Sequence, residues 1–169
     1  MKNFTDLFAH ELRDIYSAEI QIEKLLPLLA KAAHLPKLKE VFQQHHKETK
    51  QHITRLETIA NDLNINLEGR ECEALEAVVR EAKKIMKARY PHEVRDAALI
   101  SCAQRVEHYE ITVYGTLKGF AKYLDFDKAE ELLNETLKEE QLADKKLTAI
   151  AAGSIFTKGI NEQAARKSA

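Results

Sequence analysis

The sequence predicts an all-α protein, and three observations support this prediction. Only 5 glycines and 3 prolines occur among the 169 residues, so few positions can end a helix. Apolar residues recur at three-and-four spacing over most of the chain, which is the period of a helix with one buried face. No Asn-Gly or Asp-Gly pair is present to form a tight hairpin between strands.

The few helix-breaking residues divide the chain into five helical segments. Thr5 is the predicted N-cap of the first helix, and Pro27 is a predicted kink within it. The predicted helices run from Thr5 to Ala33, Lys37 to Leu63, Glu71 to Arg89, His92 to Tyr123, and from a cap at Asp125 to Asp127 as far as about Ala152. Residues 154–169 are polar and lack an apolar stripe, so we expect a disordered tail after a domain of residues 1–153.

The lengths of these helices predict a bundle. Four of them have about 27 to 32 residues, or about 40 to 48 Å, and helices of this length normally lie side by side. Tight turns at Pro36 and Asp125 predict two antiparallel helical hairpins. The connection between the hairpins, residues 64–91, is long enough to run the length of the bundle and carries the short helix. This is the ferritin-like topology; the alternative is an up-and-down bundle of five helices.

Charge and composition exclude several classes of protein. Lys and Arg total 26 and Asp and Glu total 27, for a net charge of -1, which argues against a nucleic-acid binder and a polybasic membrane anchor. No apolar stretch approaches the ~20 residues of a membrane span. We therefore expect a cytoplasmic protein with neither membrane nor nucleic-acid partners. Cys72 and Cys102 belong to no Cys-x-x-Cys motif and are expected to be free thiols.

Each long helix carries acidic or histidine residues in the middle of its predicted buried face. They are Glu19 on the first helix, His45, Glu48 and His52 on the second, Glu107 and Glu110 on the fourth, and Glu140 and Asp144 on the fifth. Burying an ionised carboxylate costs several kcal/mol unless it is paired, protonated or bound to metal. No Lys or Arg lies on these faces, so divalent cations are the natural partners. The alternatives are that helix drift exposes some of these residues or that the acids share protons.

The two halves of the chain place their acids at matching depths. Glu19 and Glu48 are 29 positions apart, and Glu110 and Glu140 are 30 apart. Each hairpin therefore brings its two acids back to a similar level, as a carboxylate-bridged dinuclear centre requires.

Three segments resemble the bacterial YciE/YciF stress-protein family: His45-His-Lys-Glu48-Thr, Val106-Glu107-His-Tyr-Glu110-Ile, and Glu139-Glu140-Gln-Leu-Ala-Asp144. The similarity extends from about Phe4 to Ala151. It implies a ferritin-like four-helix bundle that forms a homodimer and is produced under stress.

Similarity to the wider ferritin and rubrerythrin superfamily implies a ligand set. Glu19, Glu48, Glu110 and Glu140 match the four acids of the di-iron pattern, and Glu107 resembles the additional glutamate of rubrerythrins. The two histidines of that pattern are replaced by Gln51 and Ala143. His45 or His52, and Asp144, are the candidate substitutes because they lie within a helical turn; the alternative is that both histidines are core residues.

These observations predict a dinuclear iron or manganese site that reacts with oxygen or peroxide. The predicted ligands are Glu19, His45, Glu48, Glu107, Glu110, Glu140 and Asp144, with Glu48 and Glu140 expected to bridge the two ions. Since the chain lacks the Cys-x-x-Cys iron site of rubrerythrins, redox activity would need an external reductant. The alternative is a metal-free homodimeric interaction protein with a vestigial site.

Overall fold

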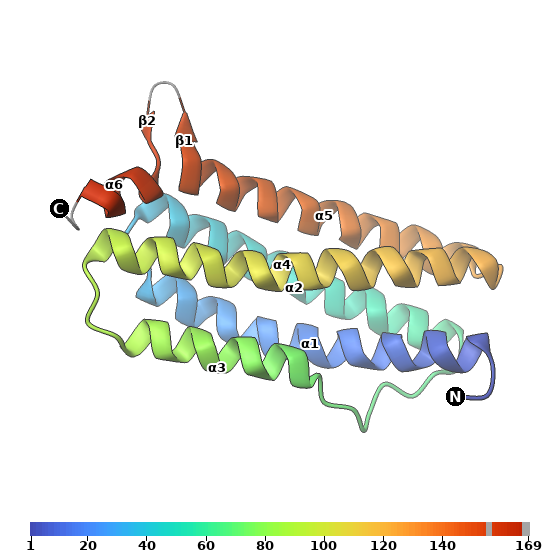
Figure 1. Ribbon diagram of the computed structural model, residues 1–169. Helices are drawn as coiled ribbons and strands as arrows, with labels where there is room; N and C mark the ends of the chain where they lie inside the picture. Colours follow the sequence, from blue (N-terminus) through green and yellow to red (C-terminus); the bar gives the residue numbers. More distant parts are fainter. Residues whose placement is uncertain (155–156, 167–169) are drawn as a thin grey trace.

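The computed structural model describes residues 1–154 and 157–166. Its long helices are α1 (Phe4–Ala32), α2 (Pro36–Asp62), α4 (His92–Tyr123) and α5 (Asp127–Ala152), and α3 (Glu73–Lys87) is shorter. They lie side by side along most of their length (Figure 1). The all-α prediction is confirmed, and the helix bounds differ from the predicted ones by two residues or fewer at each end.

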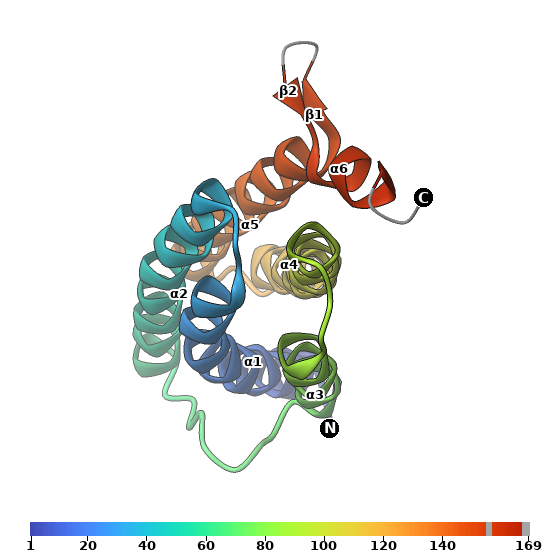
Figure 2. The ribbon, with the colours of Figure 1, turned by 90° about the vertical axis from the view of Figure 1, so that its left-hand side faces the viewer.

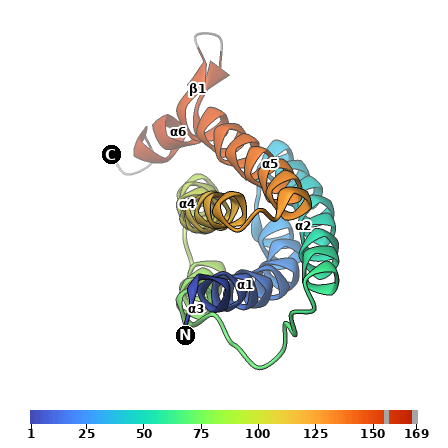
Figure 3. The ribbon, with the colours of Figure 1, turned by 90° about the vertical axis from the view of Figure 1, so that its right-hand side faces the viewer.

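The helices are connected as two hairpins joined by a long crossover. α1 packs against α2, and α4 packs against α5, while α2 also contacts α5 and α1 contacts α4. The crossover carries α3 along the bundle, where it lies against both α1 and α4, as the two end views show (Figures 2 and 3). The predicted ferritin-like topology with a short helix in the crossover is confirmed. No described helix is long and apolar enough to cross a membrane.

Local chemistry sets the helix ends. The N-cap of α1 is Asn3 rather than the predicted Thr5, because the Asn3 side chain accepts a hydrogen bond from the Asp6 amide at 2.8 Å. Pro36 occupies the first turn of α2, where its missing N–H leaves no bond unmade. Asn64 and Asp125 follow α2 and α4 with φ angles of 53° and 56°, a left-handed conformation that short polar side chains tolerate.

An apolar core fills the space between the helices on both sides of the bundle centre. Its largest fully buried members include Phe8, Leu12, Phe42, Leu99 and Tyr114. Both cysteines are buried and free, as expected. The polar side chains at the centre are thus surrounded by apolar layers, which remove them from water.

The chain after α5 differs from the predicted disordered tail. Residues 153–154 and 157–158 form the two-residue strands β1 (Gly153–Ser154) and β2 (Thr157–Lys158), and α6 (Ile160–Arg166) packs on α4 and α5. Ile160 is buried, and Gly153, at φ 76°, lets the backbone pass so close to Gly159 that a Cβ would not fit. One buried isoleucine and two glycines anchor this segment without an apolar stripe. Residues 155, 156 and 167–169, also in the predicted tail, lie outside the described residues.

Asp96 ties the first residues of α4 to the turn between α1 and α2. Its buried carboxylate accepts hydrogen bonds from the His34 amide at 2.8 Å and the Leu35 amide at 2.7 Å. Asp96→Ala would remove the acceptor for both amides and is expected to lower the free energy of unfolding by about 2–3 kcal/mol. Urea denaturation measures this, with the exposed Glu40→Ala as control; equal stabilities for the two variants would contradict the assigned role.

Candidate metal centre

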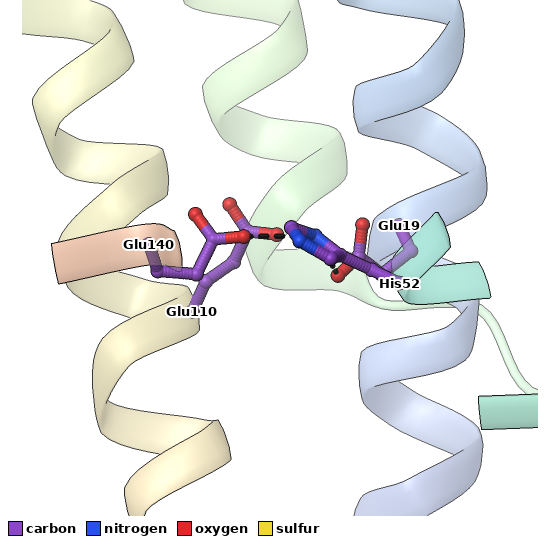
Figure 4. Close-up of side chains that lie close together, drawn as sticks. All are labelled: Glu19, His52, Glu110 and Glu140. Atoms are coloured by element: carbon purple, nitrogen blue, oxygen red, sulfur yellow. Dashed lines mark ion pairs between the residues drawn. The ribbon is translucent and has the colours of Figure 1, made fainter. Parts of the chain in front are cut away.

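Four helices bring ligand-type side chains together at the centre of the bundle. Glu19, His52, Glu110 and Glu140 come from α1, α2, α4 and α5 and converge on one point (Figure 4). Within this group, one ligand atom from each residue lies within 4.8 Å of all the others. A second group, which meets the same criterion, consists of His45, Glu107, Glu110 and Glu140. The two groups share Glu110 and Glu140, so the arrangement is that of two adjacent sites joined by two carboxylates.

Burial and mutual repulsion oppose ionisation of the α4 acids. Burial raises the pKa of Glu110 well above its usual value, and Glu140, Glu19 and Glu107 raise it further. Burial also raises the pKa of Glu107, although the neighbouring His45 offsets part of this effect. Burial and the neighbouring carboxylates therefore favour the neutral forms of these two acids.

His45 and His52 are the positive partners of the buried acids, on whose helix faces no Lys or Arg lies. His45 Nε2 lies 3.4 Å from Glu107 Oε1 and 3.6 Å from Glu140 Oε2. Burial lowers the pKa of His45, but Glu107 and Glu140 outweigh burial and raise it to about 10. Burial likewise opposes ionisation of Glu140, yet His45 and His52 lower its pKa overall.

His52 links the cluster to an ion pair outside it. Its Nδ1 lies 2.9 Å from Glu140 Oε1 and 3.4 Å from Glu19 Oε1, while its Nε2 lies 2.9 Å from Glu139 Oε2. Arg55 donates to both Glu139 oxygens, at 2.5 and 3.1 Å. Burial lowers the pKa of His52, but Glu139, Glu140 and Glu19 raise it to about 12. The contact with Glu139 fixes the ring so that Nδ1 faces the cluster.

The structure brings together five of the seven predicted ligands, namely Glu19, His45, Glu107, Glu110 and Glu140. His52, which the sequence left as one of two candidates, joins them. The predicted pair of shared carboxylates differs, because Glu110 accompanies Glu140 in both groups and Glu48 belongs to neither.

Glu48 and Asp144 lie beside the cluster rather than in it. Glu48 faces the outer side of His45, with its Oε2 3.5 Å from Nδ1, and accepts a hydrogen bond from Gln44. Asp144 turns toward α4, where it accepts a hydrogen bond from Gln104 at 2.9 Å. Both carboxylates have hydrogen-bond or ion-pair partners outside the cluster. Their spacing of one turn from cluster residues therefore did not predict the direction of their side chains.

Tyr114 adds a phenol to the cluster. This fully buried side chain donates a hydrogen bond to Glu19 Oε1. Burial and the nearby Glu19 and Glu110 raise the pKa of Tyr114, so its proton is retained.

The donor set suits a divalent transition metal. Most side-chain oxygen and nitrogen atoms of the cluster are buried from water and have no hydrogen-bond partner among the described residues. They include both oxygens of Glu110 and Glu140 and both ring nitrogens of His45. Such unpartnered polar atoms are rare in folded proteins. Carboxylate oxygen and imidazole nitrogen are the ligands that iron and manganese prefer. The residues therefore fit a pair of such ions.

Comparison with known proteins places this geometry in a family. The family described as a domain of unknown function, DUF892, matches residues 3–165. The chain belongs to the DUF892 family. Protein YciF of Escherichia coli strain K12 is 42% identical over 163 residues, which cover 96% of this chain and 98% of that protein. The resemblance to the YciE/YciF family is thus confirmed, and the family match extends beyond the cluster to residues 3–165.

Solved structures agree with this assignment to the DUF892 family. The crystal structure of the E. coli stress protein YciF matches with a TM-score of 0.89 and 42% identity over 94% of this chain and all of that chain. YcfI from Rhodopseudomonas palustris, named there as a candidate structural protein, matches with a TM-score of 0.86 and 37% identity, covering 89% of this chain and 96% of that chain. A Xanthomonas campestris protein with 19% identity and a TM-score of 0.70, covering 86% and 89%, shares the fold.

Proposed function

We propose that this protein is a stress-associated protein that binds two divalent ions, iron or manganese, in its central cluster and reacts with oxygen or peroxide. The observation that supports the proposal is the pair of four-residue groups that share Glu110 and Glu140. A structural helical bundle has no need to bury this many carboxylate oxygens without hydrogen-bond partners, because apolar residues of similar volume would stabilise it more. Homodimer formation and a cytoplasmic location are parts of the same proposal.

The chain's own residues would hold the ions and control protons around them. Glu110 and Glu140 would serve both ions, Glu19 and His52 would help to hold one of them, and His45 and Glu107 would help to hold the other. A bound pair of redox-active ions supplies the electrons for reduction of oxygen or peroxide. Tyr114 holds a proton on the Glu19 side of the cluster. The surrounding apolar layers exclude water from the cluster. Redox activity would need an external reductant.

A metal-free structural role is the second candidate function. The pairing of His45 and His52 with the acids favours it, because it compensates part of the buried negative charge without any metal. In that case the cluster would be an internal ion-pair network, and the function would lie on the protein surface.

Glu110→Gln separates the two candidates. Wild-type protein purified without chelator and loaded with Fe(II) or Mn(II) is expected to hold about two ions per chain, and Glu110→Gln fewer than one, because a shared ligand is lost. Metal content by mass spectrometry measures this, with the exposed Glu131→Gln on α5 as a control of equal charge.

The same variant is expected to increase the stability of the metal-free protein. The pKa of Glu110 is raised in the folded protein, so this acid must take up a proton on folding near neutral pH. An amide avoids this cost, which should raise the free energy of unfolding by about 1 kcal/mol. A gain in stability with a loss of metal indicates a site kept for function. Wild-type protein that is folded but takes up no metal would overturn the metal proposal and support the structural role.

A further inference from the structure

Three side chains of the metal-ligating type form a series of decreasing solvent exposure from the surface to the cluster. His108 on α4 has a side chain that is 69% exposed, Asp144 on α5 is 21% exposed, and Glu107 on α4 is 3% exposed. Glu107 belongs to the second metal group, so the series ends at the cluster.

Close contacts and unpartnered atoms connect the members of this series. His108 Nε2 lies 3.3 Å from Asp144 Oδ1. Asp144 is near enough to Glu107 for its charge to raise the pKa of that acid. Within the described part of the chain, Glu107 Oε2 is buried and has no hydrogen-bond partner. Glu107 therefore has one oxygen that no described group occupies and that could accept a cation.

The outer end of the series opens onto a hollow in the surface. Ser101, Gln104, Arg105 and His108 line a hollow of about 350 Å³ on α4. Arg105, the cationic residue in this lining, forms an ion pair with Glu81 on α3. Glu81 thus compensates the charge of Arg105. A cation in the hollow would lie beside His108, which in turn contacts Asp144.

The opposite side of α5 is less suited to the passage of cations. There Glu48 lies between the solvent and His45, but Lys146 Nζ lies 3.7 Å from its Oε1 and Gln44 donates to the same oxygen at 3.0 Å. A lysine at the mouth repels an incoming cation. Asp144 instead has the neutral amide of Gln104 and the imidazole of His108 as its partners.

We propose that His108 and Asp144 form an uptake site through which a divalent cation passes between α4 and α5 to Glu107 and the buried cluster. This inference rests on the proposed metal function, and it assigns Asp144 a transfer role instead of the ligand role that the sequence predicted. A residue on the route changes the rate of loading, whereas a ligand changes the amount bound.

Stopped-flow mixing of the metal-free protein with Co(II) tests the route, because Co(II) binds nitrogen and oxygen ligands and reports its coordination by absorbance. Asp144→Asn and His108→Ala are compared with wild type and with Glu131→Gln, which removes the same charge elsewhere on α5. The association rate constant is expected to fall about tenfold for Asp144→Asn and less for His108→Ala. Dissociation should slow in parallel, so that the final stoichiometry stays at the wild-type value.

The other outcomes each overturn the proposal in a recognisable way. Equal rates in wild type and both variants would show that cations take another route, while the metal function itself stands. Loss of stoichiometry in Asp144→Asn would make Asp144 a ligand. Absence of Co(II) binding in folded wild type would remove the metal function and the route together. Circular dichroism and thermal unfolding of each variant confirm that differences in rate do not come from misfolding.

Discussion

The free energy of unfolding of the metal-free protein is expected to fall as the pH rises from 6.5 toward 10. His45 has an ordinary pKa of 6.5 that the folded protein raises to about 10, and His52 is raised to about 12. Between these values the folded state holds protons that the unfolded state has released, so the slope of stability against pH is negative. The raised pKa values of Glu107 and Glu110 act in the same direction above their ordinary 4.5. The contribution of the two histidines is complete below pH 6.5 and is lost as the pH rises through their folded-state pKa values.

Urea denaturation in the presence of chelator between pH 6.5 and 9.5 measures this slope, which should be on the order of 1–3 kcal/mol per pH unit. The control is the His45→Gln, His52→Gln double variant, which should lose the part of the slope that the two histidines contribute and keep the part from Glu107 and Glu110. In metal-loaded protein the decline should weaken, because metal binding displaces protons and strengthens as they become scarce. A flat profile for metal-free wild type would show that both histidines are neutral in the folded protein.

Truncation of His52 is expected to have the largest single effect on the stability of the metal-free protein. His52→Ala leaves Glu19 and Glu140 without the imidazolium that they share, while Glu139 keeps its ion pair with Arg55. Removing one partner of a buried ion pair typically costs about 3–5 kcal/mol, since an uncompensated charge stays behind. Thermal and urea unfolding at pH 7 measure the loss, with the exposed His92→Ala as the matched control.

The dependence of this loss on pH identifies its cause. If an uncompensated charge destabilises His52→Ala, lowering the pH toward 5 should recover part of the stability, because the orphaned carboxylates take up protons. A loss of the same size at every pH would instead indicate a cavity left by the missing ring.

The bundle could be predicted from the sequence because its signals are local and repeated. Pro36 and the Asp125 turn break a helical period that otherwise continues for many turns, and the acids interrupt apolar stripes at matching depths. The α6 segment could not be predicted, because it depends on Ile160 finding α4 and α5 and on the close approach of Gly153 and Gly159. Contacts of this kind leave no periodic pattern.

The cluster was predictable to the level of the helix face but not of the side-chain direction. His45 and Glu48 are one turn apart on the same face of α2, yet His45 points to the cluster and Glu48 lies outside it. Glu139 and Arg55 were missed as supports of His52 because they lie at the edge of the buried face, where charged residues are ordinary. Only the packing of α2 against α5 shows that they meet.

The raised pKa values of His45 and His52 would couple metal binding at the centre of the bundle to the release of protons. The pKa values of about 10 and about 12 favour the protonated forms of both rings near neutral pH in the metal-free protein. Metal ions would then replace protons, and the net charge of the buried cluster would stay nearly constant. The positions of the helices would therefore change little between the metal-free and metal-bound states. If the proposed metal function holds, such a protein would stay folded through repeated filling and emptying, and its occupancy would depend on both the supply of metal and the pH.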